Sequence, residues 1–161
     1  MPANWCTIHY YELDFQVGDA FKVKSNYGSV NINGGFDTTR EDLFCVGVLT
    51  NVQRTEASER ARMHIGRGVQ MDSQADGDIY CSNLSEQSVF IESYYLDREA
   101  GRSLYDAVHK IYPGSKIKVF DLKQCYKQMH QQAITTYESA RESAMQTGIP
   151  LTGSLLFVSF P

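Results

Sequence analysis

Short apolar runs separated by turn-forming residues fill the first part of the chain. Aromatic and β-branched residues dominate these runs, a composition that favours strands. Asn33-Gly34-Gly35 is a strong tight-turn signal, and Asp76-Gly77 indicates a hairpin. Many short strands with regular turns predict a mainly β fold, an antiparallel β-sandwich. The expected strands lie at residues 5–13, 20–23, 30–32, 44–49, 79–81, 89–91 and 117–120. The run at 44–49 is continuously apolar, which is typical of a strand buried on both faces.

Two segments show helical patterns instead. Thr55 can cap a short helix over residues 56–65, with Gly66 as its stop. A longer helix is expected to start after Asp121 and to end near Thr147. At about 1.5 Å per residue it would be about 39 Å long, so it would overhang a small sandwich unless other helices packed against it. Its apolar stripe comprises Leu122, Cys125, Met129, Ala133, Ala140 and Ala144.

Residues 155–161 form a short apolar segment that has two equally weighted interpretations. The segment can add a strand to a sheet, or it can remain an exposed tail. Sheet edges and aggregation-prone segments share this composition, so the pattern does not separate the two. We therefore expect a domain over residues 4–147, followed by an apolar tail over residues 148–161.

Composition narrows the class of protein. A chain of 161 residues with 42% hydrophobic content fits one domain with a real core. Its formal net charge of −4 argues against direct nucleic-acid binding, which depends on a concentrated basic field. We expect no signal peptide and no membrane span, because no stretch approaches the length of about 18 consecutive apolar residues that a span needs. The four cysteines form no C-x-x-C pair, which indicates free thiols in a reducing compartment.

Catalytic and metal-binding motifs find little support. The four histidines show neither H-x-x-x-H spacing nor the Cys–His pairing of zinc sites. There is no G-x-S-x-G elbow, and Gly66-Arg67-Gly68 lacks the lysine of a phosphate loop. The acidic residues are scattered without a clear pair. We therefore expect no enzyme, no metal site and no cofactor.

The polar segment over residues 94–110 is more informative, and the sequence predicts that it is rich in turns. Three cations occur in it beside two tyrosines and a titratable histidine: Arg98, Arg102 and Lys110. Arginines suit phosphate because the guanidinium group donates two parallel hydrogen bonds to its oxygens. The alternative is a solvated loop in which the arginines pair with nearby carboxylates, namely Asp97, Glu99 and Asp106. From the residues alone, the solvated loop is the favoured interpretation.

Several blocks of the chain resemble the Mad-homology-two (MH2) domain of Smad proteins, specifically the common-mediator class (co-Smads). They include WCTI (5–8), YYEL (10–13), VGDAFKV (17–23), FCVG (44–47), NVQRTEASERARMHIGRGVQ (51–70), SYYLDREAGR (93–102), DAVHKIYP (106–113) and IKVFDL (117–122). The run at 93–102 is similar to co-Smads, and receptor-regulated Smads carry a different sequence there. The resemblance covers roughly residues 4–134.

This resemblance implies a Smad/FHA-like β-sandwich with a loop–helix region at one end and a helical bundle at the other. It implies a cytoplasmic and nuclear signal transducer and transcriptional co-regulator of TGF-β or BMP signalling. The implied partners are phosphorylated receptor-regulated Smads in a heterotrimer, with coactivators, corepressors and a possible homo-oligomer besides. In the family, one subunit's loop–helix region packs on the next subunit's bundle, and a phosphorylated tail enters a basic pocket.

Arg98, Arg102 and Lys110 match the family's basic surface beside that pocket, so the resemblance reverses the earlier preference and implies phosphoserine binding. The implied subunit interface comprises Asn33, Asp37, Leu43, Arg60, Arg62 and Asp106. Asn33 stands where the family typically has an acidic residue, and Leu43 stands where it has arginine. We therefore expect altered or weakened polar contacts at that interface.

The family domain continues with further strands, a loop that completes the phosphoserine pocket and a last bundle helix. No equivalent of that segment is recognisable after Pro150. The alternative function is therefore that of a truncated or splice-variant co-Smad fragment, either inactive or acting as a decoy.

Overall fold

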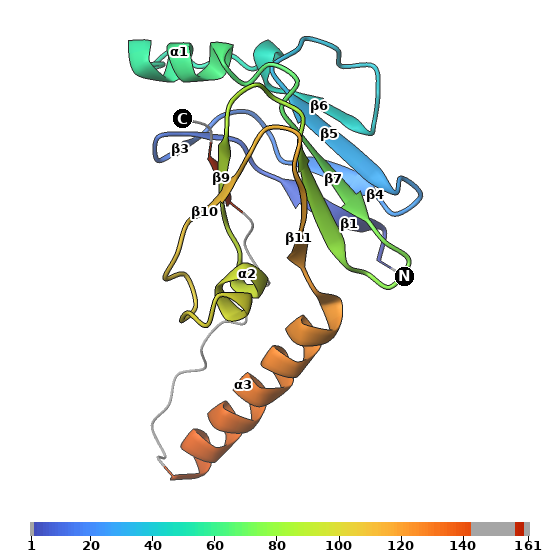
Figure 1. The fold of residues 1–161 in the computed structure, drawn as a ribbon, viewed down its shortest axis with the longest axis vertical. Coiled ribbons are helices and arrows are strands. Elements are labelled where there is room, and N and C mark those ends of the chain that lie inside the picture. The colour runs from blue at the N-terminus through green and yellow to red at the C-terminus, as the bar shows by residue number, and fades with distance from the viewer. Residues whose placement is uncertain (1, 143–156, 160–161) are drawn as a thin grey trace.

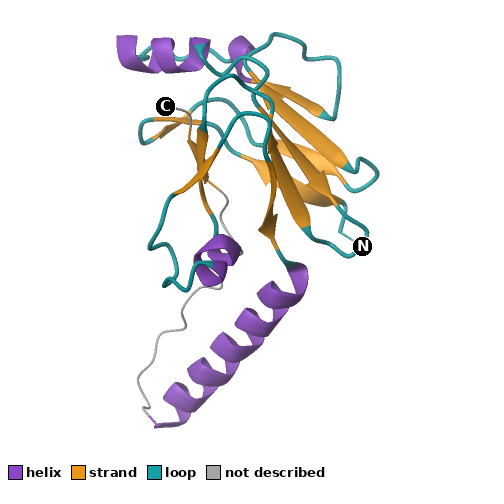
Figure 2. Cartoon of the chain, in the orientation of Figure 1, coloured by secondary structure: helices purple, strands orange, loops and turns teal. Residues whose placement is uncertain are grey.

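The computed structural model describes residues 2–142 and 157–159, and it describes side chains over residues 2–136 (Figures 1 and 2). In chain order, the elements are β1 (Asn4–Ile8), β2 (Tyr11–Glu12), β3 (Phe15–Gln16), β4 (Phe21–Lys24), β5 (Ser29–Asn33), β6 (Leu43–Cys45), the 3-10 helix η1 (Val46–Val48), α1 (Glu56–Met63), β7 (Val69–Ser73), β8 (Ile79–Asn83), β9 (Val89–Glu92), α2 (Tyr94–Glu99), β10 (His109–Ile111), β11 (Lys116–Phe120), α3 (Leu122–Glu142) and β12 (Phe157–Ser159).

The largest sheet has five strands in the order β11-β8-β7-β5-β6. All of its pairs are antiparallel except β5 with β6, which run parallel. The predicted hairpin at Asp76-Gly77 is confirmed and joins β7 to β8, with the Asp78 amide donating to Asp76 Oδ1 at 3.0 Å. Gly77 has a φ of +87°, and a Cβ there would lie 2.3 Å from Leu122 Cδ2. Glycine therefore lets this turn approach the start of α3.

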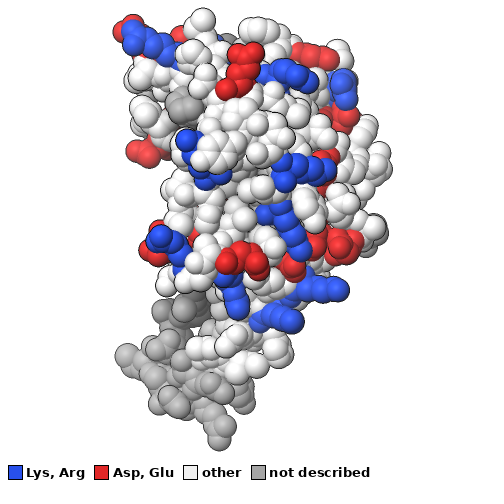
Figure 3. Space-filling view, viewed as in Figure 1, with Lys and Arg blue, Asp and Glu red and all other residues white. Residues whose placement is uncertain are grey.

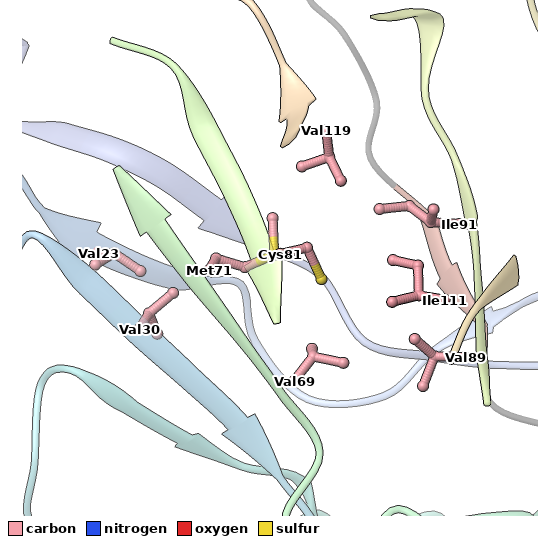
Figure 4. Close-up of a cluster of buried hydrophobic side chains, with 9 residues drawn as sticks. All are labelled: Val23, Val30, Val69, Met71, Cys81, Val89, Ile91, Ile111 and Val119. Carbon is pink, nitrogen blue, oxygen red and sulfur yellow. The ribbon is translucent and has the colours of Figure 1, made fainter. Parts of the chain in front are cut away.

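A second set of strands faces the five-stranded sheet and contains β10-β9-β12 and the pair β1-β4. The apolar side chains of the two sets meet in one cluster (Figure 4). Burying each such side chain contributes about 1.5–3 kcal/mol. The cluster consists of Val23, Val30, Val69, Met71, Cys81, Val89, Ile91, Ile111 and Val119. The mainly β sandwich expected from the strand pattern is confirmed.

The prediction of one continuous strand over residues 44–49 is wrong. Strand β6 ends at Cys45, and the chain then turns through η1. A Cβ on Gly47 would lie 2.4 Å from the carbonyl oxygen of Gly35, so the two backbones touch there and the strand cannot continue. The apolar run is buried nevertheless, because Phe44 and Val46 pack against Ile65 in a second cluster.

The short predicted helix is confirmed as α1. Thr55 Oγ1 accepts a hydrogen bond from the Ser58 amide at 3.1 Å, which is the expected N-terminal cap. The long helix is confirmed as α3, which Asp121 caps by accepting from the Gln124 amide at 2.8 Å. Its expected continuation to Thr147 lies outside the described residues, as do the side chains of Ala140 and Ala144. Figure 1 shows α3 extending away from the sandwich at the end opposite α1.

Part of the apolar C-terminal segment forms a strand. Residues Phe157–Ser159 make β12, which pairs antiparallel with β9, and Val158 lies opposite Ile91. The strand interpretation therefore holds for these three residues, and the other tail residues lie outside the described part. The division of the chain near residue 147 stays a prediction. Within the described residues, no helix combines the length and the apolar character needed to cross a membrane.

Candidate phosphoserine-binding site

The segment that carries the cations begins with helix α2, which the sequence pattern does not predict, and the expected turns follow it at residues 100–105. Helix α2 is capped by Ser93, whose Oγ accepts from the Leu96 amide at 3.3 Å and donates to the carbonyl oxygen of Val119 on β11. Six residues are too few for a periodic pattern to be visible in the sequence. The anchoring to β11 stabilises a helix of this length.

Asp97 is the buried centre of this region, with 0% of its surface exposed. Its Oδ2 accepts from the Tyr105 amide at 2.8 Å, and its Oδ1 lies 2.6 Å from His109 Nε2. A carboxylate only accepts hydrogen bonds, so Nε2 is the ring nitrogen that carries the hydrogen. The backbone carbonyl of Asp97 also accepts from the Arg102 amide at 2.8 Å. One residue therefore connects α2, the loop that follows and β10.

The three predicted phosphoserine-binding residues are all exposed. The Arg98 guanidinium lies 5.9 Å from the ring centre of Tyr94, and Lys110 Nζ lies 5.0 Å from the ring centre of Tyr112. Among the described residues, neither Arg98 nor Lys110 forms an ion pair with a carboxylate. Arg102 pairs with Asp106 at 3.6 Å, and both side chains are more than half exposed.

The alternative of arginines neutralised by neighbouring carboxylates is thus wrong for Arg98 and correct for Arg102. Asp97, one of the expected partners, binds His109 and the backbone instead. An exposed pair such as Arg102–Asp106 contributes only about 0.2–1 kcal/mol, so it is easily exchanged for another anion. On the face that Figure 3 presents, Lys and Arg are interspersed with Asp and Glu.

The register of β10 explains how Lys110 becomes available. His109 lies opposite Ile91, Lys110 opposite Phe90, and Ile111 opposite Val89. Side chains alternate along a strand, so His109 and Ile111 point inward while Lys110 points to solvent.

The predicted interface residues fall in three places: the loop between β5 and β6 with its flanking residues, helix α1, and the loop between α2 and β10. Asn33 uses its side chain within the subunit, since its Oδ1 accepts from the Gly35 amide at 2.8 Å and its Nδ2 donates to Asn31 at 2.6 Å. Asp37 accepts from the Thr39 amide and hydroxyl, and these hydrogen bonds lower the pKa of Asp37. Leu43 is half-buried at the start of β6. Asn33 and Leu43 flank the loop between β5 and β6, and Asp37 lies within that loop.

The two interface arginines of α1 differ in their surroundings. Arg60 is exposed and pairs with Glu56 four residues earlier. Arg62 is largely buried, and its Nη1 donates to the carbonyl oxygens of Gly47 at 3.1 Å and Leu49 at 3.2 Å. Arg62 therefore holds the loop before α1 in place. The last predicted interface residue, Asp106, lies apart from this group, between α2 and β10.

A buried ionic network lies beside α1 and is not predicted from the sequence pattern. Glu12 is 6% exposed and accepts from Arg54 Nε at 2.9 Å, from Asn51 at 2.9 Å and from the Tyr10 hydroxyl at 3.1 Å. Burial alone would raise the pKa of Glu12, but these hydrogen bonds together hold it below the ordinary value of 4.5. The partners are separated by up to 42 residues, so no local pattern announces them.

Metal-ligand geometry gives no further candidate. In the part of the chain that the structure describes, no group of three or more His, Cys, Asp or Glu side chains is arranged to hold a metal ion. The thiols of Cys6 and Cys81 are also poor nucleophiles, because burial raises their pKa values to about 11 and about 12.

The fold is similar to that of a solved domain from another protein. The crystal structure of the interferon regulatory factor 9 IAD domain superposes with a TM-score of 0.52, covering 84% of this chain and 67% of that one. At 12% sequence identity, this likeness shows a shared sandwich fold and nothing more.

The family follows from sequence. The MH2 domain model matches residues 3–160, which extends the resemblance well beyond residue 134. "Mothers against decapentaplegic homolog 4" of human and of rat is 57% identical over 134 residues, 83% of this chain and 24% of the relative. "Dwarfin sma-4" of Caenorhabditis elegans is 43% identical over 145 residues, 88% of this chain and 25% of the relative. The chain belongs to the MH2-domain family of Smad proteins, which are signal transducers rather than enzymes.

The chain spans about a quarter of the length of these curated relatives.

Proposed function

We propose that this domain acts as a co-Smad module that binds the phosphorylated C-terminal tail of receptor-regulated Smads. Arg98, Arg102 and Lys110 are the residues that receive the phosphoserines. The observation that supports this most is the exposure of Arg98 and Lys110 beside a buried Asp97 that binds neither of them. Arg98 and Lys110 have no carboxylate partner among the described side chains, and they are close in the chain to Arg102, whose ion pair is weak. Such cations favour an anionic ligand.

The energetics suit a phosphorylated peptide. A hydrogen bond from a guanidinium or ammonium group to phosphate contributes about 1.5–3 kcal/mol, which is tenfold or more in affinity. The charged ends of Arg98 and Lys110 lie over the aromatic rings of Tyr94 and Tyr112, and both residues remain exposed to solvent. The chain as a whole is acidic, so the attraction is short-ranged and weakens as salt concentration rises.

The subunit contacts of the proposed heterotrimer involve the other end of the sandwich. Arg60 on α1 and, in or beside the loop between β5 and β6, Asn33, Asp37 and Leu43 are exposed or half-buried there. Arg62 supports this surface from within by binding the carbonyl oxygens of the preceding loop. We place the assembly in the cytoplasm and nucleus, where it serves TGF-β or BMP signalling and recruits coactivators or corepressors to control transcription.

A peptide-binding experiment tests the proposal. Calorimetry is carried out with one serine-containing peptide in its doubly phosphorylated and its unphosphorylated form. The wild-type chain is expected to prefer the doubly phosphorylated peptide. The double variant Arg98→Ala/Lys110→Ala is expected to lose roughly 100-fold in affinity for it, because two charge-assisted contacts disappear.

The matched control removes two cations elsewhere. Lys24 and Arg40 are exposed but pair with Glu41 and Asp42, so Lys24→Ala/Arg40→Ala changes the net charge equally without touching the proposed site. This control is expected to bind like the wild type. Equal binding of both peptide forms by the wild type would reject phosphoserine recognition, although not membership of the family.

A further inference from the structure

The three residues proposed to bind phosphate are all linked to the same pair of residues, Asp97 and His109. Arg98 follows Asp97 directly in α2, and the Arg102 amide donates to the Asp97 carbonyl at 2.8 Å. Lys110 follows His109, whose Nε2 lies 2.6 Å from Asp97 Oδ1. Each cation is therefore one covalent or one hydrogen-bonding step away from the Asp97–His109 pair, although the three come from a helix, a loop and a strand.

The buried carboxylate of Asp97 is bound by a histidine and not by one of the nearby arginines. Asp97 is fully buried, and a buried carboxylate is costly unless its oxygens receive hydrogen bonds. An arginine would be the strongest partner, yet Asp97 receives its bonds from the half-buried His109 and the Tyr105 amide. The guanidinium groups of Arg98 and Arg102 stay exposed as a result.

The loop between α2 and β10 also needs this anchor. Tyr105 has a φ of +57°, a left-handed conformation that non-glycine residues seldom adopt without support. Its amide donates to Asp97, which holds the strained residue in place. On the other side, Ser93 joins the start of α2 to β11, so α2 cannot easily shift to compensate.

From these contacts we infer that Asp97 and His109 are positioning residues, which set the spacing of Arg98, Arg102 and Lys110 so that the site distinguishes two phosphates from one. This inference rests on the proposed phosphoserine binding. Neither residue touches the ligand. Their hydrogen bond fixes α2, the loop and β10 in one arrangement, so cations on three separate elements meet a ligand of defined phosphate spacing.

The test compares variants of His109 in the full chain. His109→Leu removes the hydrogen-bond donor, whereas His109→Gln keeps a donor near the position of Nε2. Affinities are measured by calorimetry for a doubly phosphorylated, a singly phosphorylated and an unphosphorylated form of one serine peptide. Thermal unfolding of each variant is recorded alongside. The control is His9→Leu, the same substitution at an exposed histidine.

We expect His109→Leu to lose about tenfold in its preference for two phosphates over one, which corresponds to about 1.4 kcal/mol. His109→Gln is expected to recover most of that preference, and His9→Leu to keep all of it. A merely structural role would lower the melting temperature without changing the ratio of the two affinities. An unchanged ratio in folded His109→Leu would overturn the inference and leave the proposed function intact.

Two further outcomes are decisive. If the wild type binds all three peptides equally, the proposed function fails and the inference fails with it. If His109→Leu does not fold, the nearly isosteric variant Asp97→Asn takes its place. A reduced preference for two phosphates in folded Asp97→Asn supports the positioning role, and an unchanged preference overturns it.

Discussion

Two buried carboxylates, one beside α1 and the other in α2, are satisfied in opposite ways. Glu12 receives the Arg54 guanidinium, with Asn51 and the Tyr10 hydroxyl completing its hydrogen bonds. Asp97 receives the His109 ring and a backbone amide. In the first region an arginine is used inside the subunit, and in the second the arginines remain outside.

The arginines of the two regions therefore have different roles: those beside α1 support a loop, and those beside α2 are available to bind a partner. Beside α1, Arg54 and Arg62 both bind the carbonyl oxygen of Leu49, so two guanidinium groups hold the loop on which the helix rests. Beside α2, the cations bind no backbone carbonyl through their side chains in the described part of the chain. A guanidinium with its donors occupied stiffens a loop, whereas one with open donors is able to bind a partner's anion.

The largest effect is expected from removing the carboxylate beside α1. Glu12→Ala removes the closer of the two carboxylates that pair with the buried Arg54 and leaves only Glu59, at 3.5 Å; breaking a buried pair in this way costs about 3–5 kcal/mol. The free energy of unfolding in urea measures the loss. Glu56→Ala, which breaks only the exposed pair with Arg60, serves as the control and is expected to cost about 1 kcal/mol or less. Similar losses in the two variants would refute the structural role of Glu12.

Because Glu12 titrates, the free energy of unfolding is expected to depend on pH. The folded-state pKa of Glu12 lies below its ordinary value of 4.5, so its stabilisation is complete above about pH 5 and is lost as the pH falls through the folded pKa. Glu12→Gln cannot titrate. The difference in unfolding free energy between the wild type and Glu12→Gln should therefore be constant near neutral pH and shrink below about pH 4.5. A difference that stays constant down to pH 3 would contradict this assignment.

A smaller effect is expected from the second supporting arginine. Arg62→Ala removes the donor to the carbonyl oxygens of Gly47 and Leu49, and we expect a loss of about 1.5–3 kcal/mol in unfolding free energy. Arg60→Ala changes the same charge on the same helix at an exposed position, and it should cost less than about 1 kcal/mol. Chemical denaturation of both variants provides the comparison. Equal losses would mean that Arg62 does not support the loop.

The smallest effect concerns the recognition region. Asp106→Asn removes the ionic partner of Arg102 and frees a third cation for the ligand. Since an exposed pair is worth about 0.2–1 kcal/mol, affinity for the doubly phosphorylated peptide should rise by about two- to fivefold at low salt. The gain should disappear at high salt, because the released charge is screened. A fall in affinity would show that Asp106 itself assists binding.

Local patterns predicted much of the fold correctly. The Asp76-Gly77 hairpin and the Thr55 cap are chemical signals contained within a few residues. Strand β7 is not among the expected strands, although Val69 and Met71 alternate with Gln70 and Asp72 as in a half-buried strand. This alternation spans only four residues, and pairing with β5 and β8 stabilises the strand. Helix α2 was missed because six residues are too few for a periodic pattern.

For the candidate site, the sequence supplied the cations but not their surroundings. Arg98, Arg102 and Lys110 were recognisable from their spacing and from resemblance to the family. Their carboxylate neighbours were equally visible, and nothing in the spacing indicated that Asp97 would turn inward to bind His109.

The sequence by itself determined that this chain is an MH2-type β-sandwich, because turn residues, caps and family motifs act over short distances or survive as recognisable blocks. Only the tertiary structure decided which side chain each buried carboxylate binds. Glu12 reaches Arg54 across 42 positions, and Asp97 reaches His109 across 12. Such pairings depend on how strands and helices pack, since the energy of a buried charge is set by the atoms that surround it in space.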